Sequence, residues 1–127
     1  MKIASMIARY LLGLMFLIFG LNGFLHFIPQ GPMPGGAAGQ FVGALMATNY
    51  MWAVSAVEVV SALFLLANRY VPLALTLIGP VLVNILLFHI FMMPQGLPPG
   101  ILATICWFLV FLSHRAAFDG VLQSKSA

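Results

Sequence analysis

The sequence is poor in charged residues, and acidic residues are the scarcest. Of its 127 residues 6% are charged and 63% are hydrophobic, and the two acidic residues are Glu58 and Asp119. A water-soluble domain needs far more polar surface than this. The five lysines and arginines are also too few and too scattered for a nucleic-acid surface. The composition therefore excludes a soluble or nucleic-acid-binding domain and predicts one integral membrane domain over residues 1–127.

Cysteine is almost absent as well. The single cysteine, Cys106, rules out an internal disulfide and a CxxC redox pair. It lies in an apolar run, where we expect it to pack as a small buried hydrophobic residue. No phosphate-binding loop, nucleotide fingerprint or nucleophile triad is present either. The sequence thus carries no redox motif of its own, and it leaves open whether the chain is itself an enzyme.

What the sequence does contain is a set of long apolar runs. We expect transmembrane helices at residues 6–28, 50–67, 71–93 and 101–118, each of a length suited to a hydrocarbon core of about 30 Å. The apolar segment 40–48 is too short to span a bilayer, and we expect an interfacial helix there. The predicted fold class is therefore all-α, an integral membrane four-helix bundle with a short interfacial helix before the second transmembrane helix.

The two halves of the chain share a loop sequence. Pro29-Gln30-Gly31 in the first half is echoed by Pro94-Gln95-Gly96 in the second. This echo indicates two parallel helix-hairpin repeats, with chance coincidence as the alternative. All five basic residues fall on the side of the bundle opposite these loops. The positive-inside rule then predicts a bacterial inner-membrane protein with both termini in the cytoplasm.

Glu58 lies in the middle of residues 50–67, a stretch with no other charge. A carboxyl group at that depth is costly and requires a partner or a proton. We expect Glu58 to be protonated at neutral pH or paired with a histidine, because Arg9 lies near the inner end of the first helix.

Further polar residues fall at helical spacings around Glu58 and predict a polar column from the outer face to the midplane. The candidate acid–base residues are Glu58, His89 and His26, and the candidate ligand-binding residues are Asn22, Asn84 and Ser55. The functional interpretation is a proton path or a pocket for a polar head group. The structural interpretation is hydrogen bonding between helices.

Three kinds of ligand could occupy this column. A quinone head group suits it best, because its carbonyl oxygens need hydrogen-bond partners with accessible protons. A haem held by His26 and His89 has no other support in the sequence. A metal bound by these histidines and Glu58 is disfavoured because Glu58 lies too deep, so we predict no metal site.

A stripe of small residues marks the first helix. Following Ala8-Arg9, the residues Gly13, Phe16, Gly20 and Gly23 recur at spacings of three and four. Small residues on one face allow a neighbouring helix to approach closely.

This stripe, the acid Glu58 after a short apolar segment, and the pair Asn84 and His89 resemble the DoxX-like family of small four-helix membrane proteins. The resemblance covers residues 9–112. The chain departs from the family at His26, where members often carry lysine, and it lacks the usual glycine-rich ending of the fourth helix. The resemblance implies an accessory subunit of a membrane redox system, including quinone-linked sulfur oxidation.

We therefore expect an accessory subunit of a quinone-linked redox system, surrounded by the lipid bilayer and partnered by a membrane oxidoreductase. The alternative is a small transporter or proton-coupled permease in which Glu58 is the coupling residue. Bound quinone in the purified protein would favour the first, and substrate flux in liposomes would favour the second.

Overall fold

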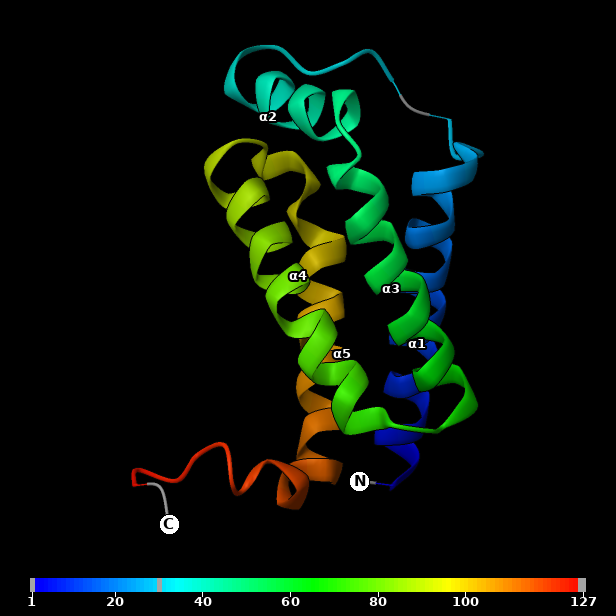
Figure 1. Ribbon diagram of the computed structural model, residues 1–127, viewed down its shortest axis with the longest axis vertical. Coiled ribbons are helices and arrows are strands. Elements are labelled where there is room, and N and C mark those ends of the chain that lie inside the picture. The colour runs from blue at the N-terminus through cyan, green and yellow to red at the C-terminus, as the bar shows by residue number, and fades with distance from the viewer. Residues whose placement is uncertain (1, 30, 126–127) are drawn as a thin grey trace.

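The computed structural model describes residues 2–29 and 31–125, and these residues form an all-helical structure (Figure 1). Gln30, the middle residue of the first PQG sequence, lies outside the described residues. The elements are α1 (Lys2–Leu25), α2 (Gly36–Ala47), α3 (Tyr50–Ala67), α4 (Val71–Phe91), a 3-10 helix (Pro94–Gly96), α5 (Leu97–His114) and a second 3-10 helix (Arg115–Phe118). Within the described chain, α1, α3, α4 and the segment containing α5 are long and apolar enough to cross a membrane. The predicted four-helix membrane bundle is confirmed.

The four long helices form a ring in which each packs against the next. α1 packs most extensively on α3, α4 packs on α3 and α5, and α5 closes the ring against α1. Figure 1 shows both termini at one end of the bundle and α2 lying across the other end. Neighbouring helices are therefore antiparallel, and Pro29, Gly31 and the second PQG sequence lie at the same end as α2.

The glycine stripe of α1 faces α3, as the spacing predicted. A Cβ atom at Gly13 or Gly20 would lie 2.9 Å from a side-chain carbon of α3. One at Gly23 would lie 1.8 Å from the Oγ atom of Ser55. These separations are shorter than real contacts of Cβ atoms, so the glycines allow the backbone of α1 to lie directly against α3.

α1 begins and ends earlier than the predicted helix 6–28. It ends at Leu25 because His26 adopts a left-handed backbone conformation with φ of +52°. The backbone N–H of Ile28 then donates a hydrogen bond of 2.8 Å to Oδ1 of Asn22. The chain leaves the helix although the residues that follow are still apolar.

α5 also differs from its predicted bounds, 101–118. It begins at Leu97, because Pro98 and Pro99 fall in its first turn, where a backbone N–H has no helical partner to lose. It ends at His114, and the chain continues as the 3-10 helix Arg115–Phe118.

The other helices are closer to expectation. α3 has the predicted bounds, and α4 ends at Phe91 rather than at residue 93. The predicted interfacial segment 40–48 is present as α2, which starts earlier, at Gly36. The Gly and Ala residues that open α2 lack the hydrophobic spacing on which the predicted start depended.

Arg9 is buried in the end of the bundle that holds the termini. Its guanidinium group donates a hydrogen bond to the backbone carbonyl of Leu65, in the last turn of α3, and lies 4.4 Å from the ring centroid of Tyr10. A cation is favoured at this place because the last carbonyls of a helix lack partners and carry partial negative charge. Arg9 therefore caps α3 and does not pair with Glu58.

Candidate functional site

Glu58 lies on the face of α3 that points into the bundle, together with Ser55 and Ser61. Its side chain is 7% exposed. None of the side-chain hydrogen bonds in the described chain involves its carboxyl group. A buried acid with no protein partner is unusual, since buried polar groups are normally hydrogen-bonded.

Three pockets meet at Glu58. The α1–α3 pocket, of about 270 Å³, lies between these two helices and beneath α2. The α1–α5 pocket, of about 290 Å³, lies between α1, α4 and α5. The α3–α4 pocket, of about 370 Å³, lies between α2, α3 and α4. Glu58 is the one residue common to the linings of all three.

Each of the six predicted site residues lines at least one of these pockets. Asn22, His26 and Ser55 line the α1–α3 pocket, Asn84 lines the α3–α4 pocket, and His89 lines the α1–α5 and α3–α4 pockets. The two histidines therefore reach Glu58 from different sides of α3. The residues lie around Glu58 in separate pockets and do not form the single column that was predicted. This difference arises because the rotation of each helix about its own axis decides which pocket a side chain enters.

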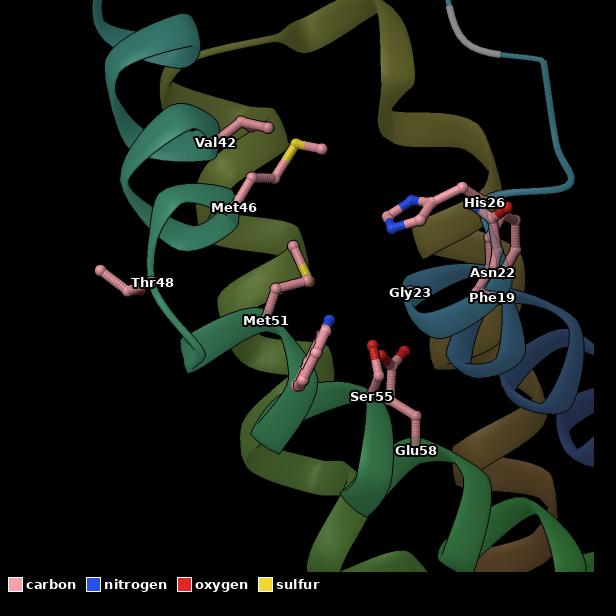
Figure 2. Close-up of a pocket in the computed structure, with 11 residues that line it drawn as sticks. Phe19, Asn22, Gly23, His26, Val42, Met46, Thr48, Met51, Ser55 and Glu58 are labelled. Carbon is pink, nitrogen blue, oxygen red and sulfur yellow. The ribbon is translucent and has the colours of Figure 1, made fainter.

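The floor of the α1–α3 pocket is polar. Ser55 is 1% exposed, and its Oγ atom has no hydrogen-bond partner in the described structure. Figure 2 shows the Ser55 hydroxyl and the Glu58 carboxyl side by side, both directed from α3 into the pocket. Ser61 has an equally unpaired hydroxyl, but it lines none of the three pockets. Ser55 and Glu58 together are thus placed to bind a polar atom.

The upper part of the same pocket is largely apolar. In Figure 2 the ring of His26 extends from the end of α1 toward α2, where Val42 and Met46 face it. Met51 and Trp52 of α3 complete this part of the wall. These apolar residues were not among the predicted site residues, although the helical spacing within 40–48 already indicated an apolar face.

His89 is held in a defined orientation. Its Nδ1 atom lies 2.8 Å from the backbone carbonyl oxygen of Ile85, so Nδ1 carries the hydrogen and Nε2 is the acceptor of the neutral ring. A Cβ atom at Gly96 would lie 2.8 Å from Nε2. The glycine of the second PQG sequence therefore makes room for this ring. Gly31, its counterpart, has no atom within 4 Å of such a Cβ position, so the two glycines have different roles.

The two asparagines bind partly to their own helices. Oδ1 of Asn22 accepts the hydrogen bond from Ile28, and Nδ2 of Asn84 donates one of 2.9 Å to the carbonyl of Pro80. Each therefore keeps one polar group, Nδ2 of Asn22 and Oδ1 of Asn84, for other partners. Their hydrogen bonds lie within or at the end of one helix, not between helices as the structural interpretation expected.

Across residues 2–29 and 31–125, no three His, Cys, Asp or Glu side chains are grouped closely enough to hold a metal ion. The comparisons with known proteins give no further guidance: no family model matches the chain, and no curated protein or solved structure matches it. The function has to be inferred from the residues around Glu58.

Proposed function

We propose that the chain is a DoxX-like inner-membrane protein that binds a quinone head group in the α1–α3 pocket and serves as an accessory subunit of a quinone-linked redox system. The observation that carries the proposal is the unpaired Ser55 hydroxyl beside the unpaired Glu58 carboxyl at the floor of this pocket. A quinone presents carbonyl oxygens on an apolar ring. Donors at the floor and apolar side chains above them match both parts of this structure.

The residues also suit the proton chemistry of a quinone. Reduction to the quinol adds two electrons and two protons. The electrons would come from a partner oxidoreductase, because the sequence has no cysteine pair or nucleotide fingerprint. Glu58 would donate one proton to the carbonyl oxygen at the floor, and His26, exposed at the end of α1, would supply the second proton to the opposite oxygen from the membrane surface. Quinol oxidation would use the same groups in reverse.

The basic residues support an orientation with both termini in the cytoplasm. Lys2 begins α1, Arg69 lies in the turn between α3 and α4, and Arg115 follows α5, all at the end of the bundle that holds the termini (Figure 1). The segments at the α2 end carry no lysine or arginine. The pocket that contains His26 would then open toward the periplasm.

A second candidate is a proton-coupled transporter. It is favoured by the position of Glu58 at the junction of three pockets, one of which extends toward α5 and contains His89. A titratable residue that faces more than one compartment is what a coupling residue requires. In liposomes, this function would give a substrate-dependent proton flux that Glu58→Gln abolishes.

The two tryptophans allow a direct test of quinone binding. Trp52 lines the α1–α3 pocket, whereas Trp107 lines none of the three pockets and donates a hydrogen bond of 3.0 Å to the carbonyl of Leu75. Quinones quench tryptophan fluorescence on contact. In nanodiscs, a long-chain quinone should quench Trp52 saturably in Trp107→Phe and should leave Trp107 largely unquenched in Trp52→Phe.

Two matched serine variants locate the binding site. Ser55→Ala removes a donor from the floor and should weaken binding about five- to tenfold, equivalent to ~1 kcal/mol for one hydrogen bond. Ser61→Ala, at an equally buried and unpaired serine of the same helix, should leave binding unchanged. Equal and linear quenching of both tryptophans would mean that quinone only dissolves in the lipid, and the proposal would be rejected.

A further inference from the structure

We infer that the ligand of this site is a lipid whose hydrocarbon tail lies in the α3–α4 pocket while its head group lies in the α1–α3 pocket. The inference rests on the proposed function and adds a basis for ligand choice. The site would select its ligand by the tail as well as by the ring.

The two pockets lie next to each other and share part of their wall. Both are lined by Val42 of α2, by Met51 and by Glu58. Figure 2 shows Val42 and Met51 projecting from α2 and α3 beside the α1–α3 pocket. Two of the three shared residues are apolar, and one of these is a flexible methionine that can move aside. A chain attached to a ring above Ser55 and Glu58 can pass this boundary without crossing a helix.

The α3–α4 pocket has the chemistry of a tail site. It is the largest of the three, and its walls include Phe41, Leu45, Val54 and Phe88. Two of its polar residues already bind their own helix, since Asn84 donates a hydrogen bond to Pro80 and Nδ1 of His89 donates one to Ile85. Ser55, whose buried hydroxyl has no partner in the described structure, lines the α1–α3 pocket and not this one. The larger pocket thus offers a long, mainly apolar wall to its occupant, while the smaller one adds the buried Ser55 hydroxyl that lacks a partner.

The α3–α4 pocket also opens sideways. Tyr50 and Phe41 on its wall are 63% and 41% exposed, and Asn84 is exposed as well. Toward this end α4 diverges from α3 in Figure 1, and α2 lies across the opening. α2 covers this opening but is packed only loosely against it, because Ala38 is the single buried residue of this helix. A bilayer lipid can therefore enter between α3 and α4 without passing through water.

Matched variants test where the tail lies. Val54 and Val81 line only the α3–α4 pocket among the three, so Val54→Phe or Val81→Phe should fill it. Val60 and Val83 lie on the same two helices, are 45% and 54% exposed and line none of the pockets, so Val60→Phe and Val83→Phe are the controls. The two substitutions that fill the pocket are on different helices. If one variant fails to fold, the other still tests whether the tail lies in this pocket.

The binding experiment compares two ligands. One is a quinone with a long isoprenoid tail, and the other has the same ring with a methyl group in place of the tail. Affinities come from quenching of Trp52 in the full-length protein in nanodiscs, corrected for partition into lipid. The tailed quinone should bind the unmodified chain at least ~10-fold more tightly, about 1.4 kcal/mol. The filling variants should remove this advantage without changing the affinity for the tailless ring, and the controls should retain it.

The outcomes separate the inference from the proposed function. Equal corrected affinities for the two quinones, or filling variants that weaken both equally, would overturn the tail site while leaving head-group binding intact. Absence of saturable quenching by either quinone would overturn the proposed function itself.

Discussion

Gly23 is the glycine of α1 at which an added methyl group would clash most severely with α3. A Cβ atom there would lie 1.8 Å from Oγ of Ser55, so α1 would have to move away from α3 or Ser55 would have to rotate. We expect Gly23→Ala to lower the free energy of unfolding by about 1–3 kcal/mol, measured by denaturant titration in micelles. Gly43→Ala, in α2 with no atom within 4 Å of its Cβ position, is the control. Equal stability of the two variants would disprove the close contact.

Glu58 is one of only two acidic side chains, which makes its protonation state measurable. Arg9 binds Leu65 rather than Glu58, so no buried cation of the described chain neutralises the carboxyl group. We expect the infrared spectrum in bilayers at pH 7 to contain the C=O stretch of a neutral carboxylic acid. Glu58→Gln should abolish this band, and Asp119→Asn, in the exposed tail, should retain it. A spectrum with carboxylate bands alone would contradict this expectation.

The residue scale also shows what a sequence can and cannot reveal. The spacing of Gly13, Gly20 and Gly23 predicts one face of a helix, and that face does contact a neighbour. The atom that meets Gly23, Oγ of Ser55, depends on the rotation of α3 about its axis. For the same reason the sequence predicted that polar residues gather around Glu58 but not that they occupy separate pockets.

At the scale of the elements, Arg9 joins two helices at the end that holds the termini. Its charged hydrogen bond to the Leu65 carbonyl adds to the hydrogen bond of 3.3 Å that this carbonyl already accepts from the backbone N–H of Asn68 at the end of α3. We expect Arg9→Met to lower the free energy of unfolding by about 1.5–3 kcal/mol, as for loss of a charged hydrogen bond. Arg69→Met removes the same charge from an exposed turn and should cost less than ~1 kcal/mol. Equal losses would indicate a general effect of charge rather than capping.

The number and type of the long helices were predictable because each needs a long apolar run. The ends of α1 and α5 were not, since a left-handed His26 ends one and a proline pair is accommodated in the first turn of the other. Both helix ends depend on local backbone conformation, which hydrophobic composition does not reveal. The family resemblance and the quinone stay predictions.

At the scale of the whole molecule, the testable feature is which end faces the periplasm. Cys106 is buried, and Cys106→Ala provides a background without thiols. On this background, Gln95→Cys at the α2 end should react with an impermeant thiol reagent in intact cells. Ser124→Cys in the C-terminal tail should react only after the cells are permeabilised. The opposite pattern would invert the orientation and place His26 on the cytoplasmic side.

The extensive packing of α1 on α3 has a consequence for biosynthesis. Both helices, the Arg9 cap and the floor of Ser55 and Glu58 lie within the first 67 residues, so the ribosome completes them before α4 is made. The first hairpin can therefore assemble in the translocon while the second is still being synthesised. A photo-cross-linker at position 13 should capture α3 in nascent chains stalled once α3 has left the ribosome, and failure to do so would show that the hairpin waits for α4 and α5.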